Sequence, residues 1–101
     1  MKQADLIGKT VTFEYSNETY RIEVLSDSQL KWTRTNGDPV GASDIEAYVF
    51  SALAPELVMF TWIEADGLGL SNTLRFSDMK LVTHASIGRD VFENAGKFSV
   101  A

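Results

Sequence analysis

The sequence predicts an all-β protein, a small up-and-down antiparallel β-barrel of about eight strands. Short segments rich in Val, Thr, Phe, Tyr, Trp and Ile alternate with clusters of turn residues along the chain, and no long segment carries the apolar spacing of a helix. Sequential hairpins hide their edges when they close into a barrel, and eight strands enclose room for side chains or one small ligand. A β-sandwich of the same strands stays open as the alternative.

Composition indicates one domain covering residues 1–101. A chain of 101 residues supports a single modest core, and its 45% hydrophobic and 23% charged residues are typical of a folded domain. The net charge of −5 and the scattered basic residues argue against a nucleic-acid partner. No apolar stretch is long enough to cross a bilayer or to act as a signal peptide, so we expect a cytoplasmic protein that binds no membrane.

The cysteine and histidine counts limit the chemistry. The chain has no cysteine and one histidine, which excludes disulfides, thiolate metal sites and multi-histidine sites within one chain. We therefore expect no metal and no cofactor, and stability that comes from packing.

The first two strands are predicted from a clean period of two. Residues 9–15 (KTVTFEY) and 19–26 (TYRIEVLS) flank the turn SNE and form a hairpin. Their apolar phases consist of Val11, Phe13 and Tyr15 on the first strand and Tyr20, Ile22 and Val24 on the second.

The next two strands surround the strongest turn signal, NGDPVG at residues 36–41. In residues 29–35 (QLKWTRT), Leu30, Trp32 and Arg34 share one face. Residues 44–53 (DIEAYVFSAL) fit a short helix as well as a strand, and we favour a strand.

The second half of the chain continues as a series of hairpins. After the turn APE comes the central run 57–65 (LVMFTWIEA), and DGLG leads from it to residues 70–76 (LSNTLRF). Strand 79–86 (MKLVTHAS) follows, and a last weak strand is expected at residues 97–100 after GRDVFENAG.

Glu64 is the most informative position, because it ends an otherwise apolar run. Its phase contains Val58, Phe60 and Trp62, whereas the other phase contains Leu57, Met59, Thr61 and Ile63. Both phases are apolar, so the period leaves open whether Glu64 faces the interior or is hydrated at the strand end. An inward Glu64 would leave an apolar stripe outside, to be covered by a second copy in a homodimer or by the tail over residues 87–101.

Polar residues in apolar phases, next to aromatic ones, predict a small-molecule site inside the barrel. The candidate ligand-binding residues are Tyr15, Trp32, Arg34, Phe60, Trp62, Glu64, Asn72 and His84. Each also has a plainer interpretation, as a core-edge tyrosine, a core tryptophan, a surface arginine or a structural histidine. The 2 Trp, 3 Tyr and 6 Phe residues are also enough to fill the barrel and leave no room for a ligand.

The neighbours of Glu64 decide what an inward carboxylate can do. Burial raises the pKa of a carboxyl group, and a nearby Arg34 would lower it again. An isolated Glu64 could donate a proton, whereas a Glu64 paired with Arg34 would be a fixed anion or half of a structural ion pair.

Several stretches resemble a known family. LIGKTVTFEYSNETYRIEV, the turn NGDPVGAS and FTWIEADG are together similar to the N-terminal barrel of phenolic acid decarboxylases, and more closely to small lipocalin-like relatives called MoaF-like proteins. The resemblance covers most of the chain and implies a calycin- or lipocalin-like barrel. It also implies that Glu64 matches the proton-transferring acid of the decarboxylases, and Tyr15 the second of their two substrate-binding tyrosines.

Other positions depart from the decarboxylase pattern. Phe13 stands where the first tyrosine is expected, and Ala42 stands where an arginine is expected after the turn. Ala65 and Asp66 replace the proline and threonine that follow the acid. We therefore expect decarboxylation to be absent, although Arg34 is a candidate to replace the missing guanidinium.

The sequence thus predicts a small-molecule-binding barrel without catalysis. It would hold a compact hydrophobic or aromatic molecule, with the polar end of that molecule near Glu64 and Tyr15. Two alternatives stay open. One is a lyase or decarboxylase-like enzyme acting on a small aromatic acid, with Glu64 as proton donor and Tyr15 beside it, and the other is a structural or oligomerising barrel filled by its own side chains.

Overall fold

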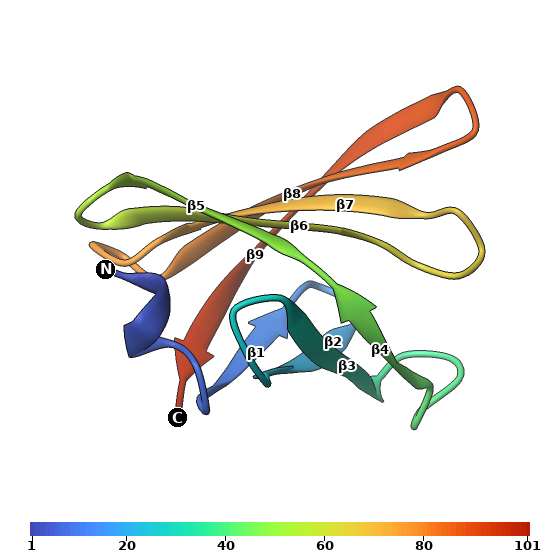
Figure 1. Ribbon diagram of the computed structural model, residues 1–101. Helices are drawn as coiled ribbons and strands as arrows, with labels where there is room; N and C mark the ends of the chain where they lie inside the picture. Colours follow the sequence, from blue (N-terminus) through green and yellow to red (C-terminus); the bar gives the residue numbers. More distant parts are fainter.

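The computed structural model describes residues 1–101 and confirms an all-β barrel. A single antiparallel sheet of nine strands rolls into a nearly closed barrel, preceded by one turn of 3-10 helix, η1 (Gln3–Asp5) (Figure 1). The strands are β1 (Thr10–Glu14), β2 (Thr19–Val24), β3 (Gln29–Asn36), β4 (Ser43–Ala47), β5 (Val49–Ala54), β6 (Leu57–Ile63), β7 (Gly69–Arg75), β8 (Lys80–Ile87) and β9 (Asp90–Val100). No helix in the structure has the length and apolar character needed to cross a membrane.

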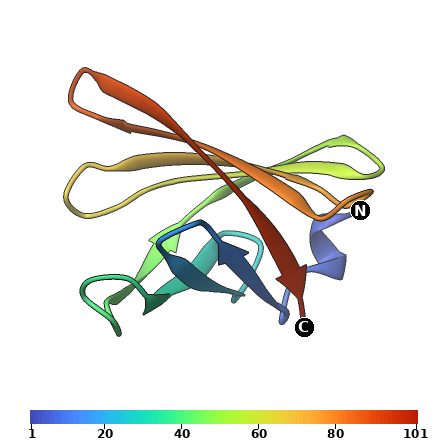
Figure 2. The ribbon, with the colours of Figure 1, turned by 180° about the vertical axis from the view of Figure 1, so that it is seen from behind.

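Two meanders make up the sheet. The strand order is β4-β3-β2-β1-β9-β8-β7-β6-β5, so β1 and β9 join a meander of four strands to a meander of five. Figure 1 and Figure 2 show β1–β4 as one layer and β5–β8 as the other, with β9 crossing from the second layer to the first. The two edge strands, β4 and β5, follow one another in the chain and are not hydrogen-bonded to each other.

The predicted strand at residues 44–53 is two strands in the structure, and the helical alternative is wrong. The chain bends inward at Tyr48, which is buried and donates a hydrogen bond to the carbonyl oxygen of Ser26 (2.7 Å). The bend carries the chain from one layer to the other. Nine strands result where about eight were expected.

The C-terminal strand is much longer than the four residues predicted. β9 pairs with β8 from Asp90 to Lys97 and with β1 from Lys97 to Val100, so the tail joins the two meanders and does not cover the outer face. A side chain at Gly96 would collide with the carbonyl oxygen of Glu14. Glycine is therefore needed at this position, where β9 passes close to the backbone of β1.

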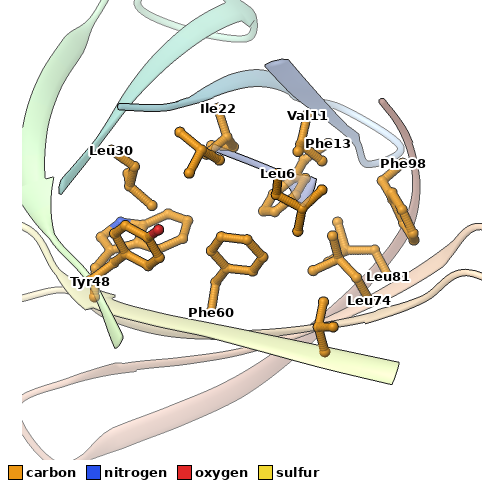
Figure 3. Packing of buried hydrophobic residues seen from close by; sticks show 13 residues of the cluster. Leu6, Val11, Phe13, Ile22, Leu30, Tyr48, Phe60, Leu74, Leu81 and Phe98 are labelled. Atoms are coloured by element: carbon orange, nitrogen blue, oxygen red, sulfur yellow. The ribbon is translucent and has the colours of Figure 1, made fainter. Parts of the chain in front are cut away.

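One end of the barrel is closed and filled. Leu6, carried in by the turn after η1, lies buried among aliphatic and aromatic side chains from the surrounding strands, and Figure 3 shows these side chains converging around Phe60. The Phe60 ring stacks on Tyr48 at 5.4 Å between centroids. Gln3 donates to the Tyr48 hydroxyl (3.0 Å) and to the Asp27 carbonyl (2.8 Å), which ties η1 across this end.

Candidate functional site

The opposite end of the barrel is hollow. A cavity of about 220 Å³ lies between the two layers, on the side where the β6–β7 and β8–β9 turns project in Figure 1. Six of the eight candidate residues line it: Tyr15, Trp32, Arg34, Trp62, Glu64 and Asn72. The alternation of the strands brings these side chains together from β3, β6, β7 and the end of β1.

Glu64 points toward the cavity from the end of β6. Val58, Phe60 and Trp62 are the buried, inward residues of β6, and Glu64 continues their phase one step beyond the strand. Hydrogen bonds within the β6–β7 turn fix the backbone of Glu64: its N–H donates to the Leu68 carbonyl, and its carbonyl accepts from the N–H of Gly67, both at 2.8 Å.

The Glu64 carboxylate is half-buried and has no basic partner. Trp62 Nε1 donates to its Oε2 at 3.3 Å, and no ion pair joins it to Arg34. Burial is the largest influence on its pKa and raises it, while the Trp62 N–H acts in the opposite direction. The charges of Asp66 and Glu46 raise the pKa further, and the more distant charge of Arg34 lowers it. The sequence left open whether Glu64 is paired with Arg34 or unpaired, and in the structure it is unpaired.

Arg34 is held by other groups. Its Nε and Nη2 donate to the Tyr20 hydroxyl at 3.2 and 3.1 Å, and its Nη1 donates to the Asp38 carbonyl at 3.0 Å. The Glu18 carboxylate lies 3.8 Å from Arg34 Nε and accepts a hydrogen bond from the Tyr20 hydroxyl. Arg34 therefore closes a network at the cavity wall, where the Glu18 carboxylate offsets part of its charge.

A directed chain of hydrogen bonds crosses the cavity floor. Asn72 is 1% exposed, and its Nδ2 donates to the Phe60 carbonyl at 3.2 Å, so its Oδ1 is free to accept from Thr83 Oγ1 at 2.8 Å. The single hydroxyl proton of Thr83 is thereby used, and the Tyr15 hydroxyl must donate to Thr83 at 2.5 Å. Burial raises the pKa of Tyr15 to about 12, so the phenol stays protonated.

Aromatic rings form one wall of the cavity. Tyr20 lies edge-on to Tyr15 at 6.2 Å and to Trp32 at 6.3 Å between centroids. Trp32 Nε1 donates to the buried Glu46 carboxylate at 3.0 Å, which fixes the indole ring. Tyr20 and Thr83 were not among the candidate residues, although the inward phase of Tyr20 was recognised from its alternation with Ile22 and Val24.

Phe60 and His84 lie outside the cavity lining. Phe60 has the expected inward phase but sits deeper, in the filled core. The inward phase of β8 is Leu81, Thr83 and Ala85, so His84 projects outward with 71% of its side chain exposed, and its Nε2 lies 3.4 Å from the Glu93 carboxylate. His84 therefore does not reach the other candidates.

The outer stripe opposite Glu64 is exposed only in part. Ile63 is 68% exposed, whereas Leu57 and Met59 are half-buried between the neighbouring strands.

No group of three or more His, Cys, Asp or Glu side chains is arranged to hold a metal ion.

Comparison with known proteins places the barrel in a family. A family model described as MoaF-like matches residues 7–99. The crystal structure of a protein from Burkholderia vietnamiensis, proposed to be a beta-lactamase, superposes with a TM-score of 0.88 over 100% of both chains at 19% sequence identity. That identity supports a shared fold and no more, and no curated protein matches the chain.

Proposed function

Because the chain belongs to the MoaF-like family, we propose that it is a small-molecule-binding barrel that acts without catalysis. The observation that carries the proposal is the contrast inside the barrel, which is filled at one end and hollow at the other. A barrel whose only task was structural would gain stability from filling both ends. An enclosed aromatic wall with a few converging polar groups is the usual form of a ligand site.

The size of the cavity favours a compact ligand. Its volume of about 220 Å³ lies below the range of about 300–1,000 Å³ that holds drug-sized molecules. Tyr20, Trp32 and Trp62 offer contact to an aromatic or apolar body, while Glu64 and Tyr15 offer a place for one polar end. The ligand class is thus a small hydrophobic or aromatic molecule with a single polar end, met in the cytoplasm as the sequence predicts.

An enzyme of the decarboxylase type is the second candidate, favoured by the position of Glu64 and Tyr15 in one cavity. Such an enzyme would need donors for the substrate carboxylate. Phe13 has no hydroxyl, Ala42 has no guanidinium, and Arg34 is bound to Tyr20 and the Asp38 carbonyl. We therefore expect no vinylphenol product from p-coumarate or ferulate, measured by absorbance. A product that is lost in Glu64→Gln would favour the enzyme instead.

Beta-lactamase activity, proposed for the structural relative, is not part of this proposal. Ser77 and Lys80 have the Ser-x-x-Lys spacing of that chemistry. Ser77 lies in the β7–β8 turn and Lys80 is the first residue of β8, both exposed at the filled end of the barrel and outside the cavity lining.

Ligand entry can be measured with the protein's own fluorescence. Both tryptophans of the chain line the cavity, so a bound molecule should change their emission and raise the melting temperature together. We propose a panel of small aromatic and aliphatic acids, alcohols, amines and pterins. Ala85 is buried in the cavity wall, and Ala85→Leu should fill the space and remove both signals. No response to any compound would favour the filled, structural barrel.

A further inference from the structure

We infer that the cavity selects a small organic cation, a protonated amine on an aromatic or apolar body, and that the Glu64 carboxylate receives the amine. This inference rests on the proposed function and names the ligand class for that site. It follows from which hydrogen-bonding groups of the lining are already used within the protein.

The donors around the cavity are mostly engaged. The Trp62 N–H is bound to Glu64, the Trp32 N–H to Glu46, and the Thr83 hydroxyl to Asn72. The Tyr20 hydroxyl donates to Glu18, and three N–H groups of Arg34 are bound. An incoming acceptor, such as a ligand carboxylate, would have to break these bonds or use what remains at the edge of the network.

The groups of the lining that still lack hydrogen-bond partners are mainly acceptors. Glu64 Oε2 accepts only the long Trp62 bond, and Oε1 has no hydrogen bond within the protein, although a carboxylate can accept about four. The Tyr15 hydroxyl donates its hydrogen bond to Thr83, so toward the cavity its oxygen can only accept one. Asn94, exposed at the rim, makes no side-chain hydrogen bond and offers one acceptor and one amide donor group.

The charged residues of the cavity lining also favour a cationic ligand. The charged residues of the lining are Glu18, Arg34 and Glu64. Arg34 is paired with Glu18 and makes no ion pair with Glu64, so its charge acts on Glu64 only from a distance. Glu46 and Asp66 add negative charge nearby. The faces of Trp32 and Trp62 are electron-rich and attract cations as well, whereas the Tyr20 ring already has the Arg34 guanidinium 5.3 Å from its centroid. A carboxylate ligand would be repelled by the same groups.

The test compares three probes of similar shape that differ in their polar end: phenethylamine, 2-phenylethanol and 3-phenylpropionate. Binding is measured by calorimetry near neutral pH on the intact chain. We expect phenethylamine to bind at least about tenfold more tightly than 3-phenylpropionate, with 2-phenylethanol between them. Glu64→Gln keeps the acceptor for Trp62 but removes the charge, so it should cut phenethylamine affinity about tenfold and leave 2-phenylethanol little changed.

Glu56→Gln is the matched control. Glu56 lies exposed at the other end of β6, outside the cavity, so its substitution removes one charge without altering the site. Equal loss of amine binding in both variants would show a general charge effect and overturn the role of Glu64. Tighter binding of 3-phenylpropionate or 2-phenylethanol would overturn the inference while the proposed function stands. Failure of all three probes, together with the wider panel, would overturn both.

Discussion

The two ends of this barrel are built from the same strands but from different side chains. Along β7 the inward residues change from Leu74 at the filled end to Asn72 and then Leu70 at the cavity, and along β8 they change from Leu81 to Thr83. The inward residues of β6 change in the same direction, and Glu64 continues their phase one residue beyond the strand. These three strands thus keep their period of two, while the chemistry of the inward residue changes with depth.

This difference separates stability from binding within one small fold. Most residues of the buried hydrophobic cluster lie outside the cavity lining, and their burial contributes hydrophobic stabilisation. The hollow end keeps a half-buried carboxylate and a cavity, both of which cost stability. Substitutions at matched positions of the two ends should therefore have different effects on the unfolding free energy.

The largest effect is expected for Leu74→Ala at the filled end. Leu74 is 0% exposed, and removing its side chain leaves a new void, which should cost about 2–5 kcal/mol of unfolding free energy in urea. Leu70→Ala, four residues earlier on the same face, should cost only about 1 kcal/mol, because Leu70 is half-buried beside space that already exists. Equal costs would contradict the difference between the ends.

A smaller effect is expected for Thr83→Val at the cavity floor. The substitution keeps the shape but leaves Tyr15 without its acceptor and the buried Asn72 without its donor, which should cost about 1–3 kcal/mol. Thr73→Val is the control, because Thr73 faces outward on β7 and makes no side-chain hydrogen bond. If both variants unfold at the same urea concentration, the chain of hydrogen bonds contributes nothing.

Glu64→Gln should stabilise the protein modestly near neutral pH. Burial raises the pKa of Glu64 in the folded state, so folding is opposed by its charge at high pH and gains as the pH falls through the folded-state pKa. The advantage of Glu64→Gln over the wild type should therefore shrink between neutral pH and the ordinary glutamate range. Urea unfolding at several pH values measures this, and an advantage that is constant with pH would contradict it.

The smallest effect is expected for His84→Ala. The imidazole is exposed on the outer face, and its pair with Glu93 is a surface interaction, so stability should change by no more than about 0.5 kcal/mol. Probe affinity should be unchanged. A clear loss of binding in His84→Ala, seen by tryptophan fluorescence, would mean that the ligand site lies on the outer face and not in the cavity.

The sequence predicted the barrel well because alternation is a local signal. Leu81 and Val82 are both apolar, however, so either phase of that strand could face inward, and His84 was placed on the wrong face while Thr83 was missed. Phe60 has the predicted phase, but its depth in the barrel depends on how the strands are staggered. A period of two carries no information about depth.

The way in which the sheet closes, through a long β9 and a bend at Tyr48, could not be predicted from local patterns either. Most of β9 is exposed, and its length depends on pairing with β8 and β1, which are supplied by distant parts of the chain. The bend at Tyr48 is set by its contacts with Gln3, Ser26 and Phe60. The homodimer expected from an outward apolar stripe stays a prediction, with Ile63 as its most exposed member.

The most direct test is an NMR titration of the isotope-labelled protein with phenethylamine. The account predicts that the indole N–H signals of Trp32 and Trp62 and the amide of Thr83 shift together and saturate, because all three lie at the hollow end. The amides of Leu30 and Leu74, in the filled end, should stay in place. Shifts confined to the outer face would contradict a ligand site inside the barrel, and the absence of any shift at high probe concentration would contradict an amine as its ligand.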